Sequence, residues 1–264
     1  MKPRFSTEFL GGQSTSETKR HFRMDGPVCA VQTPFLNATD SLPAVVPPAT
    51  TDTEESAIYV PDSYEPKYAY PLLVWLQNGP RTAQSFARTM GHISDRNYVG
   101  LGLDLTSHLG KVEDKDEFAA QLSSEQYGLE QWVRNEITRF RRTHHVHSER
   151  IYLVGQGWGA MAALQAGFAR PDWFAGVIAC DVGFPQIPHL VRRFRDLKGK
   201  RVMLASTNPT ERLEQRRLQR MLHTVGMRLC ARNYPAPQKG DLPQKLLRDI
   251  DRWVMMDICS PQCV

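Results

Sequence analysis

The stretch Ile151-Tyr152-Leu153-Val154-Gly155-Gln156-Gly157-Trp158-Gly159 decides how this chain can fold. Its apolar first half predicts a buried strand, and three glycines at alternate positions follow at once. In the pattern G-x-S-x-G, flanking glycines let a strand turn sharply into a helix, and the turn lifts the central side chain outward. The central residue here is Gly157, so the outline of that turn is present without the side chain that it normally displays.

The remainder of the chain alternates between short apolar runs and helical patterns. Expected strands cover residues 57–60, 72–76, 98–103, 151–154, 174–180, 202–205 and 227–229. Expected helices cover residues 129–140, 160–169, 212–225 and 243–256. Strands without polar alternation, separated by helices, are typical of a parallel sheet covered on both faces. The sequence therefore predicts one α/β domain at residues 56–258, a three-layer sandwich with a mostly parallel central sheet.

The two ends of the chain differ from this domain in composition. Residues 1–55 are polar and rich in Thr, Ser and Pro, which predicts a disordered or extended N-terminal arm, and residues 259–264 form a short C-terminal tail. The sequence contains neither a run of roughly 20 apolar residues nor the apolar segment of a secretory signal. We therefore expect a cytoplasmic protein without a membrane span.

Charge and cysteine content narrow the function classes further. The net charge of +5 reflects arginine clusters at residues 139–142, 192–195 and 216–217, which could bind phosphates or nucleic acid. Interspersed acids favour solvated helix faces instead, so nucleic acid is not the expected partner. The 5 cysteines are odd in number and scattered, which does not indicate a disulfide framework.

The order of these elements resembles the α/β-hydrolase superfamily, and within it the bacterial predicted-esterase group related to phospholipases and carboxylesterases. The resemblance is carried by residues 70–76, 149–162, 170–179, 233–235 and 246–254. It implies a serine-esterase fold in which a serine, an acid and a histidine follow successive strands in that chain order.

The positions that match the catalytic residues of that family are all altered. Gly157 stands at the serine position, Asn208 at the acid position and Asp241 at the histidine position. The His-Gly step that usually follows the first long strand reads Gln77-Asn78-Gly79-Pro80, and proline has no N–H to offer an oxyanion. The resemblance thus implies a degenerate catalytic triad, and no cofactor or metal is expected.

These substitutions lead to one main hypothesis. The chain is expected to be a pseudo-hydrolase that binds a small acyl or carbonyl ligand or a protein partner. The expected binding residues flank the turn and the loop after the first long strand: Gln77, Asn78, Gly79, Gln156, Gly157 and Trp158. Trp158 could fill the former pocket or stack on a ligand, and its backbone N–H could still favour an anion.

The alternative is an active acyl hydrolase with displaced residues. Asp181 follows a strand and could orient His108 or His189. Cys180 could act as a nucleophile, although a cysteine that ends an apolar strand is usually buried and inert. Ser206 also lies near a strand end, where a role in a turn is the simpler interpretation.

One further cluster has the residue types of a metal site. His144, His145 and His147 lie between a predicted helix and strand, on the amino-end side of the sheet. Because no carboxylate or cysteine stands at ligand spacing, a solvated loop is expected there rather than a metal centre.

Overall fold

The computed structural model describes residues 56–124, 128–183, 194–236 and 242–259. All of these residues belong to one compact unit, Thr51–Val264. The expected N-terminal arm lies outside the described residues, as does the C-terminal tail apart from Cys259, the last residue of a helix.

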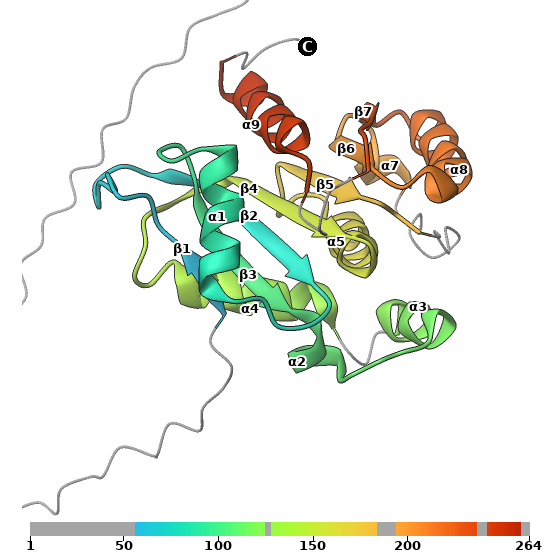
Figure 1. The fold of residues 1–264 in the computed structure, drawn as a ribbon, viewed down its shortest axis with the longest axis horizontal. Helices are drawn as coiled ribbons and strands as arrows, with labels where there is room; N and C mark the ends of the chain where they lie inside the picture. The colour runs from blue at the N-terminus through green and yellow to red at the C-terminus, as the bar shows by residue number, and fades with distance from the viewer. Residues whose placement is uncertain (1–55, 125–127, 184–193, 237–241, 260–264) are drawn as a thin grey trace, which may run out of the picture. The chain divides into compact units, whose positions relative to one another are not determined.

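A seven-stranded sheet forms the centre of the unit (Figure 1). Its strands lie in the order β1-β3-β2-β4-β5-β6-β7, and β1 pairs antiparallel with β3 while the other pairs are parallel. The strands are β1 (Ala57–Tyr59), β2 (Tyr70–Gln77), β3 (Val99–Asp104), β4 (Val146–Gln156), β5 (Gly176–Cys180), β6 (Arg201–Ser206) and β7 (Arg228–Asn233). The mostly parallel sheet predicted from the sequence is confirmed.

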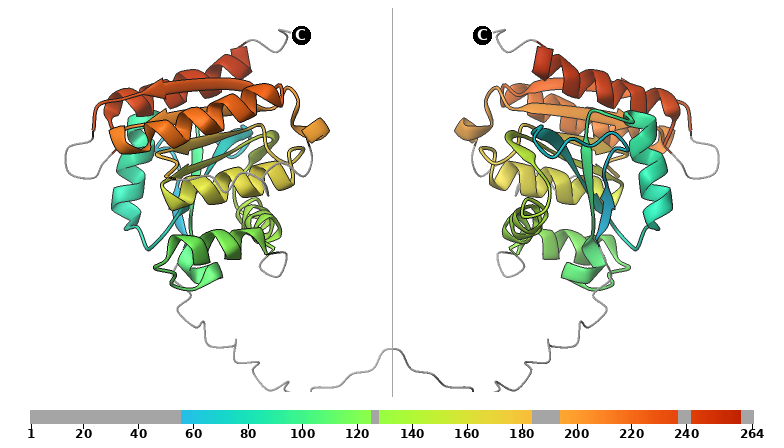
Figure 2. Two further views of the ribbon diagram at one scale, coloured as in Figure 1. Left: turned by 90° about the vertical axis from the view of Figure 1, so that its right-hand side faces the viewer. Right: turned by 90° about the vertical axis from the view of Figure 1, so that its left-hand side faces the viewer.

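Helices cover both faces of this sheet, which gives three layers (Figure 2). On one face, α1 (Ala83–Ile93) and α9 (Gln244–Cys259) pack on side chains of β2, β4, β5 and β6. On the other face lie α3 (Lys115–Ser123), α4 (Leu129–Phe140), α5 (Trp158–Ala169) and α8 (Arg212–Thr224). The expected apolar stripe of α4 is buried as predicted: Leu129, Val133, Ile137 and Phe140.

Several elements differ from the sequence expectation. Strands β4 and β7 are longer than predicted, beginning at Val146 and ending at Asn233. Helix α1 was not predicted, although its buried Phe86, Met90 and Ile93 recur at helical spacing after the N-cap Thr82. The short elements α2 (Leu105–Leu109), α7 (Phe194–Leu197) and η1 (Pro209–Glu211) were also missed. They are too short to produce a periodic signal, so only their capping residues could have indicated them.

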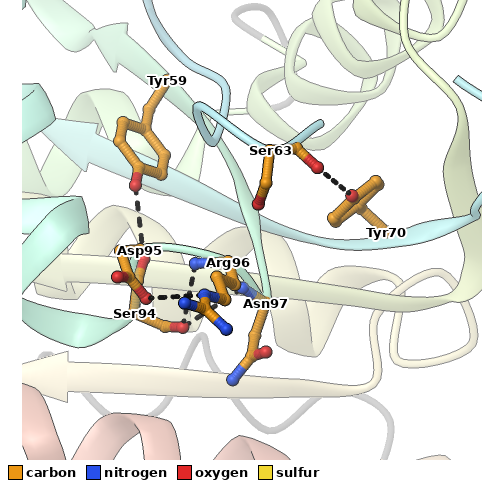
Figure 3. A network of polar contacts seen from close by, with 7 residues as sticks. All are labelled: Tyr59, Ser63, Tyr70, Ser94, Asp95, Arg96 and Asn97. Atoms are coloured by element: carbon orange, nitrogen blue, oxygen red, sulfur yellow. Dashed lines mark hydrogen bonds and ion pairs between the residues drawn. The ribbon is translucent and has the colours of Figure 1, made fainter. Parts of the chain in front are cut away.

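Polar contacts fix the edge strand β1 and the segment that follows it (Figure 3). The hydroxyl of Tyr59 donates to the carbonyl of Ser94 at 3.3 Å. The Ser94 side chain in turn accepts the amides of Arg96 and Asn97, which closes the turn between α1 and β3. Burial, followed by the nearby Asp95 and Asp62 carboxylates, raises the pKa of Tyr59, so this hydroxyl remains a donor at neutral pH.

A buried carboxylate ties the last strand to the last helix. Asp249 of α9 is 3% exposed and accepts from the Tyr234 hydroxyl at 3.0 Å. It also pairs with Arg232 at 2.9 Å and Arg252 at 3.3 Å. Burial alone would raise the pKa of Asp249, but the bonds from Tyr234 and Arg232 outweigh it and lower that pKa. The ionised form is therefore the one that the fold stabilises.

We expect Asp249→Asn to lower the free energy of unfolding at pH 7 by roughly 1–3 kcal/mol, since buried donors lose a charged acceptor. Because the folded-state pKa is depressed, this contribution is fully present above the unfolded-state pKa of about 3.9 and is lost as pH falls through the folded-state value. Denaturant unfolding between pH 3 and 8 measures the difference. The control is Asp172→Asn, which removes an exposed ion pair with Lys200. An equal effect of the two substitutions on the free energy of unfolding would contradict the stabilising role of the ionised Asp249 carboxylate.

Candidate functional site

The turn between β4 and α5 has the shape of a nucleophile elbow, with glycine at its apex. Gly157 adopts φ 58° and ψ −116°, a backbone conformation that is strained for residues with a side chain. Its N–H donates to the carbonyl of Cys180 at 2.9 Å, and its carbonyl accepts from Ala160 at 3.1 Å. The turn is thus held from both sides although no catalytic side chain extends from it.

The two flanking glycines are required by close approach rather than by chemistry. A Cβ at Gly155 would lie 2.1 Å from the carbonyl oxygen of Gly159, and a Cβ at Gly159 would lie 1.9 Å from that of Leu76. A Cβ at Gly157 meets no atom within 4 Å among the described residues. The glycines that pack the turn are therefore kept, and the position that would carry the nucleophile faces open space.

A hollow of about 380 Å³ lies beside this turn. It is lined by Trp75, Leu76, Gln77, Asn78, Gly79, Pro80, Arg81, Gln156 and Trp158. The structure thus brings together five of the six predicted binding residues, while Gly157 lies between two of them in the chain. Sequence reasoning missed Trp75 and Arg81, because nothing in an apolar strand or a polar loop distinguishes the residues that face a hollow.

The resemblance to esterases implies that the loop after β2 supplies N–H donors for an oxyanion. In this chain the Gly79 amide of that loop is already bonded. Gly79 N–H donates to Asp104 Oδ1 at 2.9 Å. The same carboxylate accepts from the amide and the hydroxyl of Thr106 at 2.9 and 2.7 Å. The sequence did not single out Asp104, although it ends the strand next to β2 and is in register with Gln77. Since Pro80 has no N–H either, neither residue at the centre of this loop offers a free backbone donor to an oxyanion.

Asp181 is buried and its carboxylate is engaged by the loop after β6. It accepts the Thr207 amide and hydroxyl, the latter at 2.8 Å, and the Asn208 amide at 3.1 Å. The Gln156 side-chain amide contacts it at 3.4 Å. These bonds explain how Asp181, the one non-glycine residue with positive φ in the described chain, holds φ 51°. Its role is to fix two loops at the rim of the site.

The acid position is likewise used for structure. Asn208 caps η1, with Oδ1 accepting the Thr210 amide at 3.1 Å and hydroxyl at 2.8 Å. Glu211 ends η1 near Asp181, and burial followed by the Asp181 charge raises the pKa of Glu211. Sequence reasoning missed Glu211, because its nearness to Asp181 depends on the adjacent placement of β5 and β6.

Of the two histidines proposed for a displaced triad, His108 is described by the structure, and it is not brought to Asp181. His108 lies in α2 and stacks on Trp132, with ring centroids 4.6 Å apart. It follows β3, which is three strand spacings from β5 in the sheet order, or roughly 14 Å between backbones. His189 and Asp241 lie outside the described residues.

Two other candidate nucleophiles are buried. Cys180 has no exposed surface, and burial followed by the charge of Asp181 raises the pKa of its thiol far above the usual range. Ser206 is also fully buried, and its hydroxyl donates to the carbonyl of Asn208 at 3.0 Å. Neither is presented as a nucleophile, and Ser206 has the turn role that the sequence favours.

Trp158 is partly buried against the helical layer. Its ring packs on Phe118 of α3 with centroids 4.7 Å apart, and the residue also lines the hollow. Trp158 therefore forms a wall of the hollow and leaves space beside it.

The histidine cluster lies elsewhere. His144, His145 and His147 border a separate hollow at the amino ends of β2 and β4. Within the described ranges, no three or more His, Cys, Asp or Glu side chains are close enough to share a metal ion.

Comparisons with known proteins identify the fold. No protein-family model matches the chain, and no curated protein matches it by sequence. Among solved structures, that of Arabidopsis thaliana SOBER1 is 12% identical, with a TM-score of 0.51 over 72% of this chain and 100% of that one. The esterase Est22 is also 12% identical, with a TM-score of 0.50 over 71% of this chain and 72% of that one. A thermostable esterase is 16% identical with a TM-score of 0.46, and the chain spans only 54% of its length.

The sheet order, the glycine turn and these likenesses together give the chain the α/β-hydrolase fold. No helix of the described residues is long and apolar enough to cross a membrane.

We expect Gly159→Ala to destabilise the protein by more than about 3 kcal/mol, because the new methyl group must displace the backbone of β2. Gly157→Ala should cost only roughly 1–2 kcal/mol, since it meets strain at positive φ but no clash. Denaturant unfolding measures both values. Gly110→Ala is the matched control, because Gly110 also has positive φ and open space around it. Equal stability of the Gly159→Ala and Gly157→Ala variants would show that the elbow is looser than described.

Proposed function

We propose that this protein is a catalytically degenerate esterase-like α/β-hydrolase that binds a small acyl or carbonyl ligand in the hollow beside Gly157. The observation that carries the proposal is the elbow itself. Its apex is a glycine with open space where a nucleophile would stand, while the packing glycines on either side are retained. The turn keeps the glycines that pack it and lacks a side chain at the nucleophile position. This combination supports a binding role for the hollow.

The neighbouring groups support the same interpretation, because each is already engaged in structure. Asn208 caps a helical turn, Asp181 receives three bonds from the loop after β6, and the Gly79 amide donates to Asp104. In serine proteases, loss of the nucleophile alone costs about 10⁶ in kcat. Little hydrolysis is expected from the groups that remain.

Trp75, which lines the hollow, carries a buried donor that a carbonyl ligand could satisfy. Trp75 is 3% exposed, and within the described chain its Nε1–H has no hydrogen-bond acceptor. A buried donor without a partner is costly by roughly 1–3 kcal/mol. Because this atom is itself buried, a carbonyl oxygen bound in the hollow would have to displace a neighbouring side chain to accept from it and remove that cost. The Arg81 guanidinium lies 6.0 Å from the Trp75 ring centroid and adds positive charge beside the same group.

The rival function is an active hydrolase with displaced residues. His189, its remaining partner for Asp181, lies outside the described residues, so the rival requires a direct assay rather than geometry.

We expect no labelling by a fluorophosphonate probe and no turnover of short-chain nitrophenyl esters above a heat-denatured control. Gly157→Ser should not restore turnover, since the Asn208 and Asp181 groups that could support a base are already bonded. Burst and steady-state assays measure the turnover of the parent protein and of the Gly157→Ser variant. Turnover that disappears on substitution of one residue would overturn the degenerate assignment.

We also expect methyl butyrate, used as a carbonyl probe, to shift the indole N–H resonance of Trp75 in a nuclear magnetic resonance titration. Trp75→Phe should weaken binding by roughly threefold to tenfold, as loss of one neutral hydrogen bond predicts. Trp173→Phe is the control, because Trp173 stacks on Arg134 away from the hollow. Binding that shifts the Gln156 side-chain amide but not Trp75 would exclude the indole as the donor. No binding at all would contradict the carbonyl-ligand proposal.

A further inference from the structure

A second hollow lies at the opposite end of the sheet from the elbow, where β2 and β4 begin. Its volume is about 610 Å³. The residues that line it include Tyr64, Arg141, Arg142, His144, His147 and Ser148. The arginines after α4 and the three histidines are close together in the chain, and the structure adds the segment that carries Tyr64 to them. None of the described lining residues is acidic.

The two arginines supply positive charge that is not neutralised nearby. Arg141 and Arg142 are exposed, and in the part of the chain that the structure describes, their guanidinium groups make neither an ion pair nor a hydrogen bond. A guanidinium offers N–H groups in a planar fork that matches the oxygens of a phosphate. The two neighbouring guanidinium groups at one hollow therefore form a binding site for a multiply charged oxyanion, to which they donate.

The histidine side of the hollow adds fixed donors. His147 Nδ1 accepts the amide of Glu149 at 3.2 Å, so the ring proton stands on Nε2, which donates. His144 is held by stacking on Phe140, with centroids 4.3 Å apart, and its Nδ1 lies 2.8 Å from the Thr143 hydroxyl. Because their ring positions are fixed before any ligand arrives, little entropy is lost on binding.

The opposite wall is also rigid. The Tyr64 hydroxyl accepts the amide of His145 at 2.8 Å, and its ring stacks on Tyr70 at 5.1 Å. Tyr70 itself donates to the carbonyl of Ser63 (Figure 3). The wall that carries Tyr64 is thus tied to both the start of β2 and the segment before β4.

We infer that this basic hollow binds the phosphate group of a small soluble phosphomonoester. Arg141 and Arg142 hold the phosphate oxygens, and His147 Nε2–H with the Ser148 hydroxyl completes the donor set. The ligand is a phosphate rather than a carboxylate, because the lining provides donors for more than two oxygens and no acid to repel a dianion. The site is independent of the function proposed for the elbow hollow.

A purely structural role for the arginines makes a different prediction. They follow the C-terminus of α4, where the helix dipole favours cations. If they served only that purpose, their loss would lower the melting temperature in phosphate-free buffer and leave the response to phosphate unchanged.

The test uses the full chain and inorganic phosphate at constant ionic strength, with binding followed by nuclear magnetic resonance shifts and by melting temperature. Arg141→Gln combined with Arg142→Gln should weaken phosphate binding by roughly tenfold or more. The matched control is Arg216→Gln with Arg220→Gln, which removes the same charge from exposed positions on α8. This control should bind phosphate within about twofold of the parent protein.

Glycerol 3-phosphate should compete with inorganic phosphate, and vesicles of phosphatidylcholine with phosphatidic acid should retain no more protein than phosphatidylcholine alone. Absence of phosphate binding, equal weakening in both double variants, or a lower melting temperature with an unchanged phosphate response would each overturn the assignment. Retention by phosphatidic acid without competition by glycerol 3-phosphate would overturn it in favour of a membrane ligand. None of these outcomes depends on whether the elbow hollow binds a carbonyl ligand.

Discussion

The contact between the first turn of α5 and the end of β2 is the constraint on which the rest of the structure depends. Gly159 lies so close to the Leu76 carbonyl that a single methyl group would overlap it. That approach sets the angle at which α5 leaves the sheet, and α5 is the buried centre of its helical layer. The turn therefore keeps its glycines for packing, independently of any reaction at Gly157.

This separation explains how the turn keeps its shape with glycine at position 157. The polar groups around the elbow hold the loops together: Asp104 closes the loop after β2, and Asp181 joins the loops after β4 and β6. Each of these carboxylates accepts at least three hydrogen bonds. Carboxylates so engaged rigidify their surroundings, and their lone pairs are occupied by structural bonds.

The sequence predicted the sheet and its coverage well, because continuous apolar strands and the stripe of α4 produce strong periodic signals. It also predicted which loops meet at the elbow, since the carboxyl ends of parallel strands share one edge. It missed Asp104 and Glu211, whose roles come from contacts between residues 25 or more positions apart. The lateral distance between His108 and Asp181 was equally hidden, because chain order does not reveal that β2 and β4 separate their strands.

The distribution of charge gives the two ends of the sheet different chemistry. Asp104, Asp181 and Glu211 gather where the strands end, whereas Arg141 and Arg142 lie where β2 and β4 begin. None of these three carboxyl groups lines the elbow hollow, where Arg81 is the one charged residue among the described lining. The hollow where β2 and β4 begin is lined by two arginines and three histidines. The two hollows therefore differ in the amount of positive charge that they offer.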